Sequence, residues 1–268
     1  MLCAHNVADG FSLPTDAALR TNMTKSQTKK RTGTELLLLT PAEIVASLSP
    51  LYGEPVWRPH GDPMTELILT ILSQNTSDTN SGRAFMRLRL RYPTWDSLLA
   101  ADPQGIEAEI AVGGLARVKA PRIKAILEEV WARRGALDLA HLAEMPLHGA
   151  KEWLRSLPGV GPKTAACVLM FAFGRPALPV DTHVHRVAQR LGLLPAKMGA
   201  ADSHDRLESL LTPAEVYPFH ISLIKHGRRL CRAQRPLCGK CPLLDGCPAG
   251  PRFLGAPVFK RGKTASAG

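Results

Sequence analysis

The sequence predicts an all-α protein built from two helical domains. Helix start and stop residues recur along the chain, and apolar residues between them return every three or four positions. No run alternates apolar and polar residues long enough to predict a strand. With 268 residues, 45% of them hydrophobic, the chain can form a substantial core. No stretch approaches the roughly 20 apolar residues of a membrane-spanning helix, and none predicts a secretory signal.

Composition divides the chain into four parts. We expect a disordered basic arm over 1–34, which contains "TKSQTKKRTG", and a flexible tail over 251–268. A six-helix barrel is expected over 55–175. A second domain is expected to combine 35–54 with 176–250.

The helices follow in order from their end signals. The first begins at a capping box, with Thr40 as N-cap, Pro41 at the first helical position and Glu43 two residues later. A later helix is predicted from Pro121 to Gly135. We expect about ten helices by this count of caps and breaks, and the clearest cover 64–76, 81–93, 120–135, 148–156, 162–174, 181–193 and 203–211.

The charge balance predicts a polyanionic partner. Lysine and arginine total 34 against 23 aspartate and glutamate, which leaves a formal net charge of +11. Such a charge attracts polyanions, most commonly nucleic acid. Charge alone leaves open a basic but otherwise ordinary enzyme.

The stretch "LPGVGPKTA" predicts a helical hairpin. An amphipathic helix ends at Ser156, two glycines flank Val160, and Pro162 starts the next helix. Gly159 and Gly161 allow left-handed angles and close approach. We expect the freed N–H groups of Val160 and Gly161 to point outward and to bind a phosphate without reading sequence. The alternative is a tight turn with no ligand.

A lysine and an aspartate follow this hairpin. Lys163 lies in the first turn of an apolar helix, where the helix dipole and burial both disfavour its ammonium form. That placement predicts an amine nucleophile able to form a Schiff base. The alternative is a surface lysine that binds phosphate as a point charge. Asp181 precedes another helical pattern, where the alternative role is an N-cap that contributes about 1 kcal/mol.

Residues 157–187 resemble the helix–hairpin–helix and Gly/Pro–Asp motif of the endonuclease III superfamily of DNA glycosylases. "LPGVGPKTA" and "VDTHVHRV" carry the resemblance, which extends over roughly residues 35–250. It implies that Lys163 attacks the sugar C1′ and that Asp181 assists by electrostatics and proton transfer. It also implies hairpin contacts to DNA from Pro158, Gly159, Val160 and Gly161.

Four cysteines with the spacing C-x6-C-x2-C-x5-C predict a metal centre. With no export signal they are expected to be reduced or metal-bound. The asymmetric set fits an iron–sulfur cluster better than zinc, although spacing alone leaves zinc open. The superfamily resemblance implies a 4Fe-4S cluster and DNA contacts from Arg232 and Arg235 in the loop after the first ligand. The four cysteines are Cys231, Cys238, Cys241 and Cys247.

Two further segments resemble the parts of this superfamily that enter the duplex. "ILSQNTSD" resembles the segment whose glutamine is inserted; Gln74 falls one place early, and Asn75 takes the usual position. "GLARVKA" resembles the loop with an intercalating leucine, which would be Leu115. The alternatives are that Gln74 ends a helix and that Leu115 is an ordinary buried leucine.

The resemblance implies a bifunctional glycosylase that removes oxidised pyrimidines and has AP lyase activity through the Lys163 Schiff base. Its partner would be double-stranded DNA with damaged bases or abasic sites. We expect a monomer that is cytoplasmic, nucleoid-associated and free of membrane contact. The alternatives are a monofunctional adenine or thymine mismatch glycosylase, a lesion-binding family member with weak catalysis, and a zinc-finger-type binding module.

Overall fold

The computed structural model describes residues 38–59 and 61–255. The predicted basic arm over 1–34 lies outside the described residues. The predicted tail begins inside them, where residues Gly250–Phe253 form a short helix, α12. No described helix has the length and apolar character needed to cross a membrane.

The all-α prediction is confirmed: the described residues form helices joined by short 3-10 turns and loops, with no β-strand. The longest helix is α6. The helices are α1 Pro41–Tyr52, α2 Pro63–Leu72, α3 Asp78–Arg91, α4 Trp95–Ala100, α5 Pro103–Ile110, α6 Ala116–Arg134, α7 Leu147–Arg155, α8 Pro162–Phe173, α9 Thr182–Arg190, α10 Ser203–Glu208, α11 Val216–Arg229 and α12.

Local signals placed some helix ends well and others badly. The capping box of α1 forms as predicted, because the Glu43 carboxylate accepts from the Thr40 N–H at 2.8 Å and the Thr40 hydroxyl accepts from the Glu43 N–H. The start of α6 at Pro121 is wrong, since the helix begins five residues earlier. Pro121 lies inside it, at the cost of one backbone hydrogen bond.

The segment 55–175 contains one helix more than predicted. Its described residues form seven α-helices, α2 to α8, because Trp95–Ala100 makes a short helix of its own. Thr94 caps that helix by accepting from the Ser97 N–H. The capping box at Thr94 therefore starts a helix in a stretch without clear periodicity.

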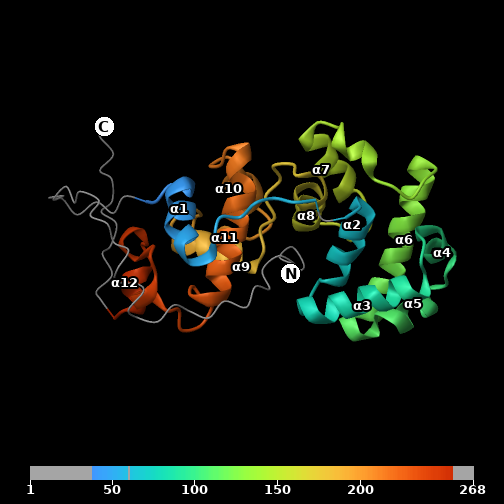
Figure 1. Cartoon of the computed structure of the whole chain (residues 1–268), viewed down its shortest axis with the longest axis horizontal. Coiled ribbons are helices and arrows are strands. Elements are labelled where there is room, and N and C mark those ends of the chain that lie inside the picture. Colours follow the sequence, from blue (N-terminus) through green and yellow to red (C-terminus); the bar gives the residue numbers. More distant parts are fainter. Residues whose placement is uncertain (1–37, 60, 256–268) are drawn as a thin grey trace.

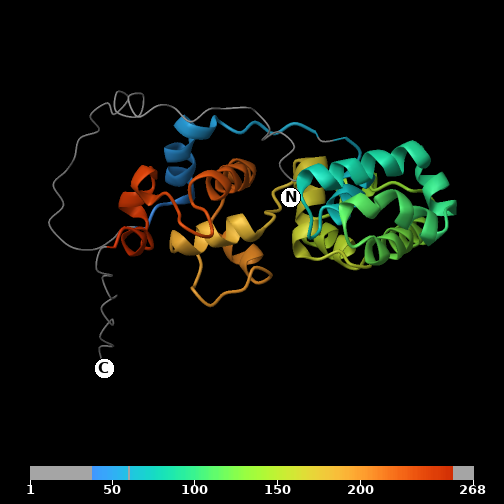
Figure 2. The same ribbon diagram turned by 90° about the horizontal axis from the view of Figure 1, so that it is seen from below.

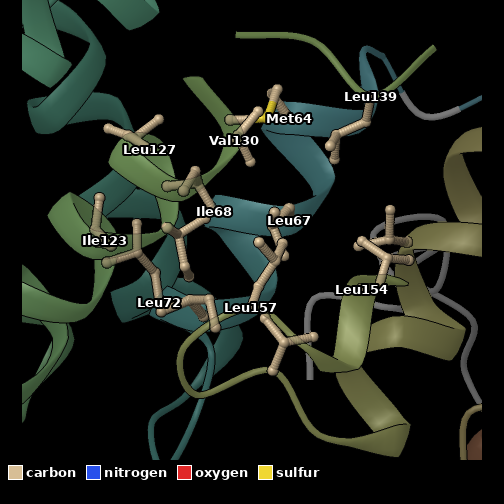
Figure 3. Close-up of a cluster of buried hydrophobic side chains, with 14 of the residues drawn as sticks. Met64, Leu67, Ile68, Leu72, Ile123, Leu127, Val130, Leu139, Leu154 and Leu157 are labelled. Atoms are coloured by element: carbon tan, nitrogen blue, oxygen red, sulfur yellow. The ribbon is translucent and has the colours of Figure 1, made fainter. Parts of the chain in front are cut away.

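Two hydrophobic cores organise these helices. The first contains buried side chains from α2 through α8. Figure 3 shows part of it, where Ile68 and Leu72 of α2 lie beside Ile123 and Leu127 of α6. The second core is formed mainly by α1, α8, α9 and α11. We call α2–α8 the first lobe and α1 with α9–α12 the second lobe; they lie at opposite ends of the molecule (Figure 1).

Helix α8 contributes to both cores and so joins the lobes. Val168 and Leu169 belong to the first core, whereas Cys167, Met170 and Phe171 belong to the second. The chain also crosses between the lobes twice, from α1 to α2 and from α8 to α9 (Figure 2). The N-terminus of α8 is therefore held at the boundary between two packed units.

Candidate active site

An open cavity of about 810 Å³ brings together residues from five regions of the chain. We call it the groove. The loop between α2 and α3, the first turn of α8 and the start of α9 all contribute to its walls. Four of the predicted site residues, Lys163, Asp181, Gln74 and Asn75, line it. The full lining is Ser73, Gln74, Asn75, Thr76, Ser77, Asp78, Lys163, Val180, Asp181, Thr182, Ala200 and Arg228.

Lys163 reaches the groove because of how α8 begins. Gly161 is the N-cap in an extended conformation, and Pro162 occupies the first helical position. Lys163 follows, half-buried, while the next residues of α8 are buried in the cores. The backbone of Lys163 is thus held by the packed helix, while its side chain lines the groove.

Asp181 serves as the N-cap of α9 and also lines the groove. Its Oδ1 accepts hydrogen bonds from the N–H groups of His183 and Val184, both at 2.8 Å. Burial by itself would raise the pKa of this carboxyl group, but the bond from Val184 and nearby charge, including that of Lys163, lower it below its ordinary value. Asp181 is therefore a carboxylate beside the Lys163 amine, as well as a structural cap.

Three side chains hold the segment that leads to Asp181. The Leu178 N–H donates to Glu208 at 2.7 Å, and the Leu178 carbonyl accepts from His204 at 2.8 Å. The Pro179 carbonyl accepts from Nδ1 of His220 at 2.9 Å. His220 is fully buried, and burial is the main reason that its pKa falls to about 4. These contacts from α10 and α11 set the position of the carboxylate.

The hairpin corrects one expectation about phosphate contacts. The Val160 N–H does not point outward; it donates to the Leu157 carbonyl at 3.2 Å, and the Val160 side chain is 5% exposed in the first core. Val160 therefore stabilises the turn, through this internal hydrogen bond and through its buried apolar side chain. Pro158 and Gly159 are exposed, and the space beside Gly161 is open.

Gln74 and Asn75 point to different surroundings. Gln74 lies beyond the end of α2, where its Oε1 accepts from Arg122 at 2.9 Å and its Nε2 lies 3.5 Å from both the Gly159 carbonyl and the Thr164 hydroxyl. Asn75 is exposed and has a φ of 54°. The internal network holds Gln74 inward, so Asn75 is the residue presented to solvent.

Leu115 is an exposed side chain on a strained turn. It has a φ of 53° and is 53% exposed, directly before α6. The alternative of an ordinary buried leucine is wrong. A large apolar side chain on a left-handed residue carries a conformational cost, which is typical of functional positions.

One polar feature near these segments was missed from the sequence. Lys119 is 1% exposed, and its Nζ donates to the carbonyls of Leu72 at 2.6 Å and Gly113 at 3.1 Å. Its spacing from the buried Ile123 placed it on the apolar face of α6, and that signal could have revealed it. Arg228 lines the groove and forms an ion pair with Asp78 at 3.1 Å.

The four predicted cysteine ligands surround a second cavity. All four line it, together with His226 of α11 and with apolar residues that include Val187 of α9 and Phe253 of α12. Among the described residues, no three histidine, cysteine, aspartate or glutamate side chains converge as ligands of one metal ion. Burial, followed by the neighbouring thiols, raises the pKa of Cys241 to about 12. The four thiols are therefore the sulfur donors available to a metal group at this cavity.

The loop after Cys231 exposes the two predicted arginines. Arg232 and Arg235 are exposed, and Arg235 has a φ of 48°. Arg190 of α9 holds the loop by donating to the Arg232 carbonyl at 2.7 Å and to the Ala233 carbonyl at 3.0 Å. The backbone is thus fixed while the charged side chains face solvent.

Comparisons with a protein family and with individual proteins agree with one another. Residues 68–213 match the family model described as HhH-GPD superfamily base excision DNA repair protein. A candidate DNA glycosylase of Arabidopsis thaliana is 36% identical over 185 residues, which cover 68% of this chain and 63% of that protein. Endonuclease III of Synechocystis sp. is 36% identical over 227 residues, which cover 84% of this chain and 95% of that protein.

A solved structure is similar over most of the chain as well. The structure of a trapped endonuclease III–DNA covalent intermediate superimposes with a TM-score of 0.69 and 30% sequence identity. The superposition covers 81% of this chain and 99% of that chain.

Proposed function

Because this chain belongs to the HhH-GPD superfamily of base excision DNA repair proteins, we propose that it removes oxidised pyrimidines from double-stranded DNA and cuts the strand at the resulting abasic site. It is a DNA glycosylase of the endonuclease III type. The observation that carries the proposal is the presence of Lys163 and Asp181 on the walls of one open groove.

Lys163 is the proposed nucleophile. A base must leave the duplex before its glycosidic bond can be attacked. The Nζ lone pair of Lys163 forms a bond to C1′ as the bond from C1′ to the base breaks; the amine loses a proton and the departing base gains one. The sugar ring then opens to leave an imine between Nζ and C1′. Loss of a C2′ proton expels the 3′ phosphate and cuts the strand.

Asp181 is the proposed electrostatic and proton-transfer partner. Positive charge develops on the sugar as the base departs, and a nearby carboxylate stabilises it. The depressed pKa of Asp181 keeps that group ionised at neutral pH. The three contacts on residues 178 and 179 hold it at a fixed place in the groove wall.

Cys231, Cys238, Cys241 and Cys247 are the proposed ligands of a 4Fe-4S cluster. The shared cavity supports a metal group held by these four thiols, and their asymmetric spacing favours a cluster over a zinc ion. When bound, the cluster would hold the four thiolates in place and so order the loop that carries Arg232 and Arg235. Those arginines would then contact DNA phosphates, as would Pro158, Gly159 and Gly161 of the hairpin.

The proposed partner is duplex DNA with damaged bases or abasic sites, bound by one copy of the chain. Asn75 and Leu115 are proposed to enter the space left by the displaced base, since both are exposed on residues with positive φ. An enzyme with this substrate works at the chromosome, so we propose a cytoplasmic, nucleoid-associated location.

A strand-cutting assay tests the proposal. Duplexes carry an oxidised thymine, a thymine opposite guanine, or an adenine opposite an oxidised guanine, and products are resolved with and without alkali. We expect cutting of the oxidised-thymine duplex without alkali. Base release that needs alkali for cutting would indicate a monofunctional enzyme, and binding without base release would indicate a lesion sensor.

A further inference from the structure

Three segments proposed to contact DNA converge on one face of α6. They are the insertion turn 113–115, the groove loop 73–77 and the hairpin 158–161, and each meets Lys119 or Arg122 of that helix. These segments are far apart in the sequence. The contacts that fix these segments relative to one another are distinct from their proposed contacts with DNA.

Lys119 links the first two segments. Its Nζ donates to the carbonyl of Leu72, the last residue before the groove loop, and to that of Gly113, at the start of the insertion turn. The side chain is 1% exposed, so no water competes for these carbonyls. Since burial opposes a charged amine, these two bonds are what keep Lys119 in place; burial, then Arg122, lowers its pKa to about 8.

Arg122 links the groove loop to the hairpin. It lies three residues after Lys119, on the same side of α6. Its guanidinium donates to Gln74 Oε1 at 2.9 Å. Its side chain also packs directly over Gly159, where an added Cβ would lie 2.1 Å from Nε and 2.3 Å from Cδ. Gln74 also connects the groove loop to the hairpin, because its Nε2 lies 3.5 Å from the Gly159 carbonyl.

We propose that Lys119 and Arg122 are positioning residues for base displacement: together they fix the insertion turn, the groove loop and the hairpin as one rigid unit. Neither touches the reacting atoms. The proposal rests on the proposed glycosylase function and deepens it, because it names what keeps Leu115 and Asn75 aimed at the same base pair.

The proposal separates two steps of the reaction. Displacing a stacked base needs all three segments in register, whereas the lyase step on a single-stranded abasic site needs only Lys163 and Asp181. Loss of the Lys119 or Arg122 contacts should therefore slow base release from duplex DNA far more than it slows the lyase step.

The test uses the full-length, cluster-loaded protein, four single variants and one double variant. Lys119→Met and Arg122→Met remove the proposed contacts. Lys124→Met is the matched control, because Lys124 is also on α6 and also donates to a main-chain carbonyl, that of Leu99, but away from the groove. Leu115→Ala removes the inserted side chain. Each is assayed for single-turnover release of an oxidised thymine from duplex and for cutting of a single-stranded abasic oligonucleotide.

We expect Lys119→Met and Arg122→Met to slow base release by about tenfold or more while changing the lyase rate less than about twofold. The control Lys124→Met should change both rates equally. Lys119→Met added to Leu115→Ala should cost little more than Leu115→Ala alone, since both act through one insertion step. Fluorescence of 2-aminopurine beside the lesion, which reports unstacking on binding, should rise less with the two variants than with the wild type.

Equal loss of base release and lyase activity in Lys119→Met and Arg122→Met would overturn the proposal in favour of a purely structural role. So would rates that are additive with Leu115→Ala. If Lys119→Met does not fold, Arg122→Met alone decides the matter, because Arg122 is not a core residue. A wild-type protein with neither activity would instead refute the proposed function itself.

Discussion

The Asp181 carboxylate caps α9 and is also the proposed electrostatic partner of Lys163, and substitution can separate the two roles. Asp181→Asn keeps a good N-cap for α9 but removes the negative charge from the groove. We expect unfolding free energy to change by less than about 1 kcal/mol, while single-turnover base release falls by about a hundredfold. Urea unfolding and quenched-flow assays measure the two quantities. A large stability loss with unchanged turnover would mean that Asp181 is only a cap.

His220 predicts a pH dependence of stability. Its pKa falls from an ordinary 6.5 to about 4 on folding, mainly through burial. The unfolded chain therefore binds more protons between these values, so the stability contribution of His220 is present above pH 6.5 and is lost as pH falls through 4. The full effect is on the order of 3 kcal/mol.

Urea midpoints measured from pH 7 to pH 4 check this effect. His220→Gln keeps a donor for the Pro179 carbonyl but cannot be protonated, so its stability should fall less steeply with acid than that of the wild type. Parallel curves for the two proteins would contradict the assignment.

At the scale of elements, the hairpin depends on two glycines for different reasons. Gly159 has a φ of 71° and lies under the Arg122 side chain, whereas Gly161 has a φ of −93° and open space around it. Gly159→Ala should destabilise the protein by about 1–3 kcal/mol because both backbone and packing resist the methyl group.

Gly161→Ala is the matched control, since alanine fits its backbone angles. We expect almost unchanged stability but weaker DNA binding, because the methyl group would stand where a phosphate approaches. Thermal unfolding and fluorescence anisotropy with abasic duplex measure both variants. Equal stability of the two would show that the left-handed turn at Gly159 is not required.

Local signals predicted the elements whose ends are set locally. The Thr40 capping box, the Pro162 start of α8 and the Asp181 cap of α9 all lie where the sequence placed them. The start of α6 did not, because the helix begins directly after Leu115, whose left-handed conformation has no local sequence signal and no side-chain cap. The same limit applies to Lys119: its position on the helix could be predicted, but one of its two carbonyl partners, Leu72, lies 47 positions away in the sequence.

For the whole molecule, the two lobes and the groove at their junction could not be derived from spacing. The sequence placed Lys163 and Asp181 eighteen positions apart and could not tell whether they face one another. Helix α8 decides this by packing into both cores, which sets the amine beside the segment held by His204, Glu208 and His220. Motifs predicted the chemistry of the site, and long-range packing determined its geometry.

The charge of +11 predicts salt-sensitive DNA binding. The logarithm of the association constant should fall linearly with the logarithm of salt concentration. Arg232→Gln and Arg235→Gln should each reduce that slope by about 1, if each contacts one phosphate. Anisotropy titrations from low to high salt measure the slope. An unchanged slope in both variants would remove these arginines from the DNA interface.

The cluster assignment predicts a coloured protein whose colour and stability are linked. Cys241→Ser should lose the broad absorption near the visible edge and lower the unfolding temperature, because the second lobe loses one ligand of the proposed cluster. Metal analysis together with absorption spectra checks both. A colourless wild type with one zinc per chain would contradict a 4Fe-4S cluster.

The central claim is that the Lys163 amine attacks C1′, and borohydride trapping tests it most directly. The protein is incubated with duplex carrying an oxidised thymine or an abasic site, reduced, and digested to identify the attached peptide. We predict a covalent complex through Lys163 that is absent in both Lys163→Ala and Lys163→Arg. Absence of any trapped complex in the wild type, with DNA binding intact, or attachment at another residue, would contradict the mechanism.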